Sequence, residues 1–329
     1  MSDVLIRATD LSVHFPLRGT LFGERPVVRA CEGINLEIEK GSFFGLVGES
    51  GSGKTTLGRA MLKAAPISHG EVVFTDDDVT YDLGSLKGDE LKDYRKRSQL
   101  IFQDPYAALS PRMTVRDIIA EPLEVMGLTS NREETDSRVR EIAAKCRLNL
   151  EHLRRFPHAF SGGQRQRISI ARALVSGPKF IVADESVAAL DVSIQVDVLN
   201  LLNAIQRESG ITFLFISHDL SVIAHTCDFV AVMYLGQIVE AAPTRKLFSE
   251  TSHPYTKALL SAIPSLDPDV SSKAQRLEGE IPSPINPPPG CRFNTRCPHA
   301  RDRCRQEVPE WREVSAKHHV ACHFAEELS

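Results

Sequence analysis

The chain has 329 residues, of which 42% are hydrophobic and 25% charged, so it is long enough for one large globular domain and a smaller one. A formal net charge of -4 supplies no long-range positive field that would favour nucleic acid. The sequence lacks both a run of eighteen apolar residues and, at residues 1–4, the start of an export signal. We therefore expect a cytosolic protein without a transmembrane helix, in which structural disulfides are rare.

The N-terminal part of the chain alternates between strand and helix patterns around a glycine-rich loop. Residues 4–15 alternate as an edge strand does, and residues 34–38 alternate more clearly. The apolar run at 42–47 predicts a buried strand leading into the loop, and a helix is expected from residue 53 or 54 to about residue 64. Residues 98–102 predict another buried strand.

The pattern changes at about residue 105, where strand signals vanish and charged stretches such as 132–146 have helical spacing. We interpret residues 105–165, approximately, as a helical subdomain inserted into an α/β core. Beyond it, strands and helices alternate again, which predicts a largely parallel sheet with helices on its faces. The expected strands are 179–183, 211–216 and 229–234, and the expected helices are about 165–176, 192–208 and 219–226.

The composition shifts once more after about residue 250. Residues 281–290 contain too much proline for a helix or a central strand. Four cysteines follow this segment. The sequence therefore predicts two domains, a large one over 1–250 and a small cysteine-rich extension over 251–329.

Residues 48–56 (GESGSGKTT) have the spacing of a phosphate-binding loop, G-x-x-x-x-G-K-[ST]. The glycines let the backbone turn tightly and bring its N–H groups to phosphate oxygens, and the following helix adds about +0.5 charge at its N-terminus. Lys54 is predicted to bridge the β- and γ-phosphates, and the Thr55 hydroxyl to ligate Mg²⁺. A glycine turn that binds nothing is the alternative, but the strand before it and the helix after it favour phosphate binding.

Four further polar residues have the character of a hydrolytic site. Asp184 and Glu185 end an apolar strand pattern, and we expect Asp184 to hold Mg²⁺ and Glu185 to act as general base on the attacking water. Gln103 follows the strand pattern 98–102 and can reach both Mg²⁺ and that water. His218 follows another strand pattern and can contact the γ-phosphate. Each residue alone is commonly a bystander, and their order along the chain supports the catalytic interpretation.

Together these residues resemble the ATP-binding cassette (ABC) ATPases. The segment 160–164 (FSGGQ) is similar to the family signature LSGGQ, and 188–191 (AALD) is similar to the D-loop, with Ala in place of its usual first Ser. The match covers about residues 4–250, and it implies that Phe15 stacks on adenine. The resemblance and the loop motif together predict these nucleotide or Mg²⁺ contacts: Phe15, Gly48, Ser50, Gly51, Gly53, Lys54, Thr55, Thr56, Gln103, Ser161, Gly162, Gly163, Gln164 and Asp184.

The signature motif explains why such a protein acts in pairs. Ser161, Gly162 and Gly163 precede a helix and form a second anion-binding helix N-terminus. We expect this N-terminus to bind the γ-phosphate of a nucleotide held by another subunit. ATP then joins two subunits, and hydrolysis removes the phosphate that both of them contact.

The C-terminal part narrows the resemblance to the ATPases of oligopeptide/dipeptide importers. The segments 230–239, 252–260 and 287–293 are similar to that subgroup. The resemblance implies a second, related ATPase subunit in a heterodimer, two transmembrane permease subunits and an extracytoplasmic solute-binding protein. It also implies that a cytoplasmic helix of a permease docks at 105–160, next to Gln103.

The four cysteines are spaced Cys291-x5-Cys297-x6-Cys304-x17-Cys322, which is not the usual spacing of a zinc ribbon. Four thiols in a cytosolic protein still indicate a metal site. The related importers carry a four-iron four-sulfur (4Fe–4S) cluster on such cysteines, and the resemblance implies one here. Zinc, with help from nearby histidines, and free thiols are the alternatives. The histidines are His299, His318, His319 and His323.

We therefore expect an α/β phosphate-loop ATPase of the ABC type, peripheral to the cytoplasmic face of the cell membrane, that powers peptide import. The expected cofactors are ATP, Mg²⁺ and the cluster. The alternatives are a soluble ABC ATPase that acts on nucleic acid or the ribosome, and an importer of nickel, glutathione or a sugar. A single cassette without a basic stripe or a long heptad run argues against the soluble class.

Overall fold

The structure is a computed structural model that describes residues 4–17, 25–77, 79–263 and 277–328. Residues 1–3, which belong to the segment where we predict no export signal, lie outside these ranges. The chain divides into two compact units. The first unit comprises residues 1–6, 38–43 and 73–216, and the second comprises residues 7–37, 44–72 and 217–329.

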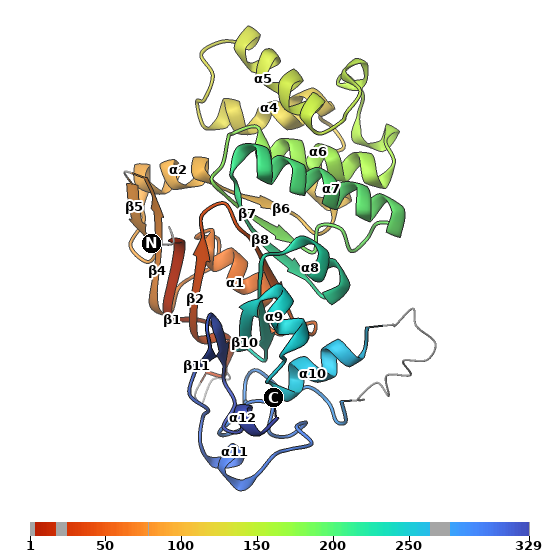
Figure 1. Cartoon of the computed structure of the whole chain (residues 1–329). Coiled ribbons are helices and arrows are strands. Elements are labelled where there is room, and N and C mark those ends of the chain that lie inside the picture. Colours follow the sequence, from red (N-terminus) through yellow and green to blue (C-terminus); the bar gives the residue numbers. More distant parts are fainter. Residues whose placement is uncertain (1–3, 18–24, 78, 264–276, 329) are drawn as a thin grey trace. The chain divides into compact units, whose positions relative to one another are not determined.

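The first unit contains the longest of the described helices (Figure 1). In chain order its elements are half of β4 (His69–Asp76), β5 (Val79–Asp82), α2 (Gly88–Arg97), β6 (Ser98–Ile101), α3 (Pro105–Ala108), α4 (Val115–Val125), α5 (Arg132–Lys145), η1 (Leu150–His152), η2 (Pro157–Ala159), α6 (Gly162–Leu174), β7 (Phe180–Asp184), α7 (Val192–Ser209) and nearly all of β8 (Thr212–Ser217).

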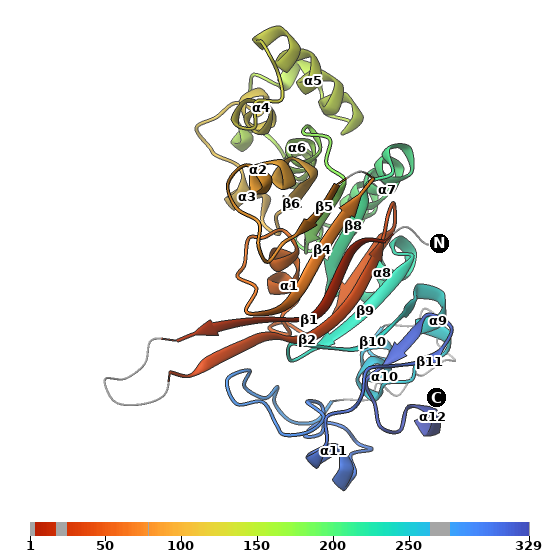
Figure 2. The same ribbon diagram turned by 90° about the vertical axis from the view of Figure 1, so that its left-hand side faces the viewer.

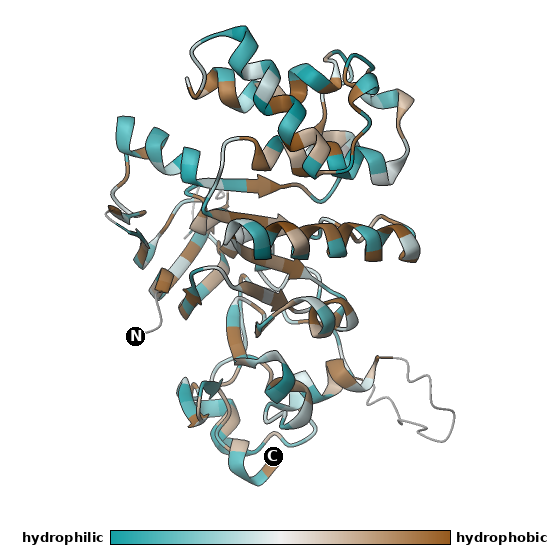
Figure 3. Ribbon diagram, turned by 45° about the horizontal axis from the view of Figure 1, so that its top comes forward, coloured by the Kyte–Doolittle hydropathy of each residue, from teal (hydrophilic) through white to brown (hydrophobic). Residues whose placement is uncertain are grey.

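Three parallel strands form the centre of this unit, in the order β6-β7-β8. Every residue of β7 and β8 is buried, and both strands are apolar except at their ends, where Asp184 closes β7 and Thr212 and Ser217 flank β8. Helix α7 is amphipathic and buries Val198, Leu202 and Ile205 on one face. Figure 3 shows this difference, with mainly brown strands and helices that alternate between brown and teal.

Residues 105–159 contain α3, α4 and α5 with the two short 3₁₀ turns, and α4 packs on both α5 and α6 (Figure 1). The starts of α4 and α5 are capped by side chains. Thr114 accepts the N–H of Asp117 at the start of α4, and Asn131 accepts the N–H of Glu134 at the start of α5. These caps stabilise the starts of both helices. Pro122 lies inside α4.

The second unit is built around strands of mixed direction. Its elements are most of β1 (Val4–Pro16) and β2 (Val27–Glu39), most of β3 (Phe43–Val47), α1 (Lys54–Met61), α8 (Leu220–Thr226), β9 (Phe229–Tyr234), β10 (Gln237–Pro243), α9 (Thr244–Ser249), α10 (Pro254–Ser261), α11 (Asp302–Gln306), β11 (Arg312–Ser315), β12 (His318–Val320) and α12 (Ala325–Leu328). Figure 2 shows β1 and β2 side by side.

The C-terminal region adds two strands to the sheet of the second unit. The order is β3-β9-β10-β12-β11, in which β3 and β9 are parallel and the later neighbours antiparallel. Glu240 of β10 lies opposite Val320 of β12. Residues after position 311 therefore share a sheet with β3, the strand that leads into the glycine loop.

Some elements differ from the sequence prediction. β1 is hydrogen-bonded to β2 on one side and to β4 on the other, so the expectation of an edge strand is wrong. The alternation that suggested an edge reflects a strand with one exposed face. Helix α6 begins at Gly162, three residues before the predicted start, because Ser161 caps it. None of the described helices is long and apolar enough to cross a membrane.

Candidate functional site

The glycine loop follows β3 directly and requires glycine at two positions. Gly48 has φ 153° and Gly53 has φ 106°. A Cβ at Gly48 would lie 2.1 Å from the carbonyl oxygen of Met233, and a Cβ at Gly53 would lie 2.2 Å from that of Ala30. The backbone is therefore packed closely on its inner side. By contrast, a Cβ at Gly51, which has φ 78°, would meet nothing within 4 Å.

Lys54 is the first residue of α1, and its side chain is buried, with 5% exposed. Its ammonium donates to the carbonyl oxygens of Gly48 and Glu49, at 2.7 and 2.9 Å. The side chain therefore turns back over the loop, where an anion would lie. Thr55 and Thr56 are half-buried and Ser50 is exposed. A positive group at a glycine loop that opens a helix N-terminus suits a phosphate.

The carboxylate pair at the end of β7 belongs to the first unit. Asp184 is the last strand residue and is 5% exposed. Glu185 leaves the strand with φ 44°, a left-handed conformation that costs a non-glycine residue about 1–3 kcal/mol. Its N–H is held by the carbonyl of Ile216 at 3.0 Å. Its side chain accepts a hydrogen bond from Gln103 Nε2 at 2.9 Å. The structure thus brings two predicted catalytic residues into contact.

The signature segment caps helix α6. Ser161 Oγ accepts the N–H of Gln164 at 3.4 Å, and Gln164 Oε1 accepts the N–H of Ser161 at 3.0 Å. This reciprocal capping box commits the Gln164 side chain to the helix start. A Cβ on Gly163 would lie 2.4 Å from Ile194 Cγ2, so glycine is required there by the packing of α6 against α7.

The predicted nucleotide residues are divided between the two compact units. Gln103, the signature residues 161–164, Asp184 and Glu185 lie in the first unit. The loop residues 48–56, Phe15 and His218 lie in the second. Phe15 is near the end of β1 and 36% exposed, and His218 is exposed directly after β8.

Sequence reasoning missed several contacts of the glycine loop. The loop pattern leaves the residue at Glu49 unspecified. Its carboxylate nevertheless pairs with Arg296, and its N–H donates to Tyr255 Oη. Both partners lie more than 200 positions along the chain, so no local pattern reveals them. The strained backbone of Glu185 also has no signal in the residue type, because glutamate rarely adopts a positive φ.

The four C-terminal cysteines line one small cavity of the second unit. His299 and His323 line it too, whereas His318 binds Glu240 and His319 stacks on Trp311. Among the residues that the structure describes, no three His, Cys, Asp or Glu side chains are arranged to hold one metal ion. Burial raises the pKa of Cys291 to about 12 and that of Cys297 to about 11.

The three remaining cysteines are Cys31, Cys146 and Cys227, and all are buried. Burial raises the pKa of both Cys31 and Cys146 to about 12. Their burial is that of small core residues.

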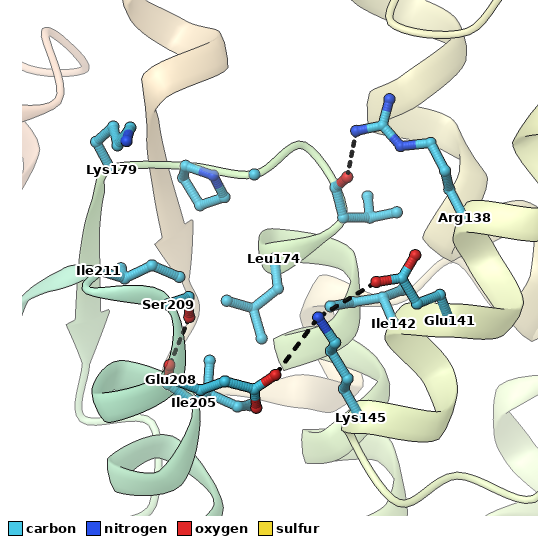
Figure 4. Close-up of a pocket in the computed structure, with 13 residues that line it drawn as sticks. Arg138, Glu141, Ile142, Lys145, Leu174, Lys179, Ile205, Glu208, Ser209 and Ile211 are labelled. Carbon is cyan, nitrogen blue, oxygen red and sulfur yellow. Dashed lines mark hydrogen bonds and ion pairs between the residues drawn. The ribbon is translucent and has the colours of Figure 1, made fainter.

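The first unit contains further cavities. One, of about 310 Å³, lies among α5, α7 and the end of α6, where Lys145 pairs with Glu141 at 3.2 Å and Glu208 at 3.8 Å (Figure 4). It contains no predicted site residue. Another, of about 300 Å³, is an apolar groove that includes Phe102, Pro122 and Val125. Val125 is 79% exposed, and Phe102 is also exposed.

The sequence matches two protein families. The pattern described as ABC transporter matches residues 31–188, and the pattern described as oligopeptide/dipeptide transporter, C-terminal region, matches residues 239–304. The second match covers the proline-rich segment and three of the four cysteines. It thus coincides with the composition shift seen in the sequence.

Individual relatives match over almost the full chain. The oligopeptide transport ATP-binding protein AppF of Bacillus subtilis is 45% identical over 327 residues, which is 98% of each chain. YkfD of the same organism is 46% identical over 322 residues, which is 97% of this chain and 95% of YkfD. Among solved structures, the dimeric ATP-binding cassette MJ0796 bound to ADP and Pi superimposes with a TM-score of 0.64 at 26% identity, covering 73% of this chain and 99% of that one.

Proposed function

The chain belongs to the ATP-binding proteins of the oligopeptide/dipeptide ABC transporter family, and from this premise we propose that it powers the import of peptides across the cytoplasmic membrane. It is an ABC-type ATPase with a phosphate-loop α/β fold. The observation that carries the proposal is the presence, in one chain, of the cassette motifs and the C-terminal region of peptide transporters.

The proposed roles of the nucleotide residues follow the local geometry. Lys54, held over the glycine loop, binds the β- and γ-phosphates, and the loop glycines supply backbone N–H groups. Phe15 stacks on adenine and His218 contacts the γ-phosphate. Ser50, Gly51 and Thr56 complete the loop's contacts.

Glu185 is the proposed general base, and Gln103 orients the same water. Their hydrogen bond supports the assignment, because it places the amide and the carboxylate at one point. Thr55, Gln103 and Asp184 are the oxygen donors for Mg²⁺, which suit this hard cation. When bound, Mg²⁺ neutralises charge on the phosphates during transfer.

The signature residues are proposed to act on the nucleotide of a second ATPase subunit. Gly162 and Gly163 open helix α6 without side chains, which leaves its first N–H groups accessible to an anion. Gln164, although it caps the helix, remains in the proposed contact set. The related cassette MJ0796 was solved as a dimer. For this chain we propose a heterodimer with a related ATPase subunit.

The apolar groove at Phe102 and Val125 is the proposed docking site for a cytoplasmic helix of a permease. A helix seated there contacts Phe102. The next residue, Gln103, is hydrogen-bonded to Glu185. The complete transporter then has two permease subunits and an extracytoplasmic solute-binding protein, and this chain lies on the cytoplasmic face of the membrane. No role for nucleic acid is proposed.

The four-cysteine cavity is the proposed site of a 4Fe–4S cluster. Four soft thiol donors from one chain face one enclosed space, which suits iron–sulfur ligation. The cavity also has His299 and His323 in its lining. When bound, the cluster's iron stabilises the thiolates that burial disfavours. Zinc is the alternative cofactor.

Peptide-stimulated ATP hydrolysis tests the proposed function. The chain is reconstituted in vesicles with its permease subunits, partner ATPase and binding protein, and phosphate release is measured with di- and oligopeptides, nickel, glutathione or a sugar. We expect only peptides to stimulate hydrolysis. Stimulation by another of these solutes alone would leave the ATPase assignment but reject the substrate. Stimulation by nucleic acid or ribosomes without permeases would favour the soluble class.

A further inference from the structure

A buried ion pair joins the glycine loop to the cysteine-rich region. The guanidinium of Arg296 contacts the carboxylate of Glu49 at two points, Nη1 to Oε2 at 2.7 Å and Nη2 to Oε1 at 3.1 Å. The Arg296 side chain is only 6% exposed and that of Glu49 is 26% exposed. A two-point contact of this kind fixes the orientation of the carboxylate as well as its position. Its burial separates it from surface ion pairs, which contribute little.

The backbone of Glu49 is held from the same side. Its N–H donates to Tyr255 Oη at 2.9 Å. Tyr255 is fully buried and packs against Tyr234 and Phe293, with ring centroids 4.7 and 5.4 Å apart. The side chain and the N–H of Glu49 are thus both fixed by residues that lie far outside the loop in sequence.

The backbone carbonyl of Glu49 contacts the lysine of the loop, Lys54. The carbonyl oxygen of Glu49 accepts a hydrogen bond from Lys54 Nζ at 2.9 Å. Arg296 and Tyr255 therefore fix the residue that, in turn, holds Lys54. A chain of contacts thus runs from Arg296, the neighbour of Cys297 in sequence, through Glu49 to the Lys54 ammonium, which is proposed to bind phosphate.

A second connection reaches the other end of the loop. Arg292, adjacent to Cys291, donates to the carbonyl of Leu235. The N–H of the next residue, Gly236, donates to the carbonyl of Ser52 at 2.8 Å. Arginines next to two of the cysteines thus reach both halves of the loop, Arg296 directly at Glu49 and Arg292 through the backbone of Leu235 and Gly236.

The charge of Glu49 gives the Arg296 contact a functional consequence. A carboxylate in a phosphate-binding loop repels the phosphates of ATP unless a cation compensates it. Arg296 supplies that cation in a site with little exposure to water, where the repulsion is weakly screened. The pair therefore affects phosphate binding as well as the rigidity of the loop.

We infer that Arg296 and Tyr255 are positioning residues for ATP binding, which hold and neutralise the loop through Glu49. The inference rests on the proposed phosphate-binding role of the loop. It assigns a function to the C-terminal region beyond that of carrying cysteines, because the region shapes the nucleotide site of its own chain.

The test is a fluorescence titration of the full chain with a labelled ATP analogue. We expect Arg296→Ala to weaken binding roughly tenfold, because it leaves the Glu49 charge uncompensated and the loop less ordered. The double variant Arg296→Ala/Glu49→Gln should recover part of this loss, since the repulsive charge is gone. A merely structural role predicts no such recovery.

Arg303→Ala is the matched control. Arg303 is adjacent to Cys304, as Arg296 is to Cys297, and it also pairs with a glutamate. Its partner is Glu307, the residue that directly follows its own short helix α11, and both side chains are more than half exposed. The ATP affinity of Arg303→Ala should equal that of the wild type. An equal loss in both variants would overturn the inference, as would unchanged affinity in a folded Arg296→Ala protein.

Two further variants keep the test decisive. If Arg296→Ala does not fold, Tyr255→Phe removes only the hydroxyl that accepts the Glu49 N–H and should weaken binding roughly threefold. Unchanged affinity in Tyr255→Phe would then reject the inference. Lys54→Ala separates this inference from the proposed function, because wild-type affinity in that variant rejects the loop's role itself. A loss in Lys54→Ala with no effect of Arg296→Ala or Tyr255→Phe rejects only the positioning role.

Discussion

Gln103 donates a hydrogen bond from Nε2 to the carboxylate of Glu185 at 2.9 Å, which joins the end of β6 to the end of β7. Gln103 also follows Phe102, which lines the apolar groove. One residue therefore separates the proposed permease docking site from the proposed general base. A helix that seats in the groove can shift Gln103 and thereby change how Glu185 is held.

The first prediction concerns this carboxylate. Glu185→Gln should lower the rate of ATP hydrolysis by about 10²–10⁴-fold, because an amide cannot accept a proton from the attacking water. Nucleotide affinity should stay within about twofold of the wild type, since the loop of the second unit is unchanged. Phosphate release and ATP titration measure the two quantities. Hydrolysis at the wild-type rate in the reconstituted complex would show that Glu185 is not the base.

The second prediction compares the two glycines of the signature. Gly163→Ala should reduce the free energy of unfolding by about 1–3 kcal/mol, because its Cβ would lie 2.4 Å from Ile194 Cγ2. Gly162→Ala is the control, since its Cβ would lie 3.8 Å from Leu190 Cδ2, an ordinary contact. Urea unfolding of both variants measures the difference. Equal stability of the two would contradict the packing of α6 against α7 described here.

The third prediction concerns a buried carboxylate that anchors the C-terminal region. Glu240 is fully buried and accepts the N–H groups of Ser252 and His253, at 2.7 and 3.1 Å, and bonds to His318 Nε2 at 2.8 Å. Glu240→Ala leaves these groups without an acceptor and should cost about 3 kcal/mol or more. Glu313→Ala removes an exposed carboxylate on β11 that accepts the N–H of Lys317, and it should change stability by about 1 kcal/mol or less. Similar losses in the two variants would contradict this account.

The sequence predicts well those parts of the fold that depend on local pattern. Short, largely apolar segments indicate buried strands, and every residue of β7 and β8 is indeed buried. The glycine loop is predictable because its conformation excludes most side chains at Gly48 and Gly53. The candidate roles of Gln103 and Glu185 were inferred separately, and the structure adds their contact.

Other features depend on contacts between distant segments, which no local pattern reports. β11 and β12 are short and join the sheet only through pairing with β10. The Arg296–Glu49 pair links positions 247 residues apart. The position of β1 within its sheet likewise depends on β2 and β4, so its alternation alone suggested an edge.

The fourth prediction concerns the cysteine cavity. Anaerobically purified protein should contain about four irons per chain and absorb broadly in the visible range, with bleaching on reduction. Cys297→Ser should lose most of the iron, whereas Cys146→Ala, which removes a buried thiol outside the cavity, should retain it. About one zinc per chain and no visible absorbance would show that the site holds zinc and would reject the cluster. Absence of both metals would leave free thiols.

The central claim is that ATP hydrolysis by this chain drives peptide uptake, and uptake itself tests it most directly. Vesicles that contain the complete transporter, with the chain and ATP on one side, are supplied with a radiolabelled peptide and its binding protein on the other. We predict ATP-dependent accumulation with the wild-type chain and none with Glu185→Gln. Accumulation at the wild-type rate with Glu185→Gln would contradict the account, as would ATP hydrolysis by the wild type without peptide accumulation.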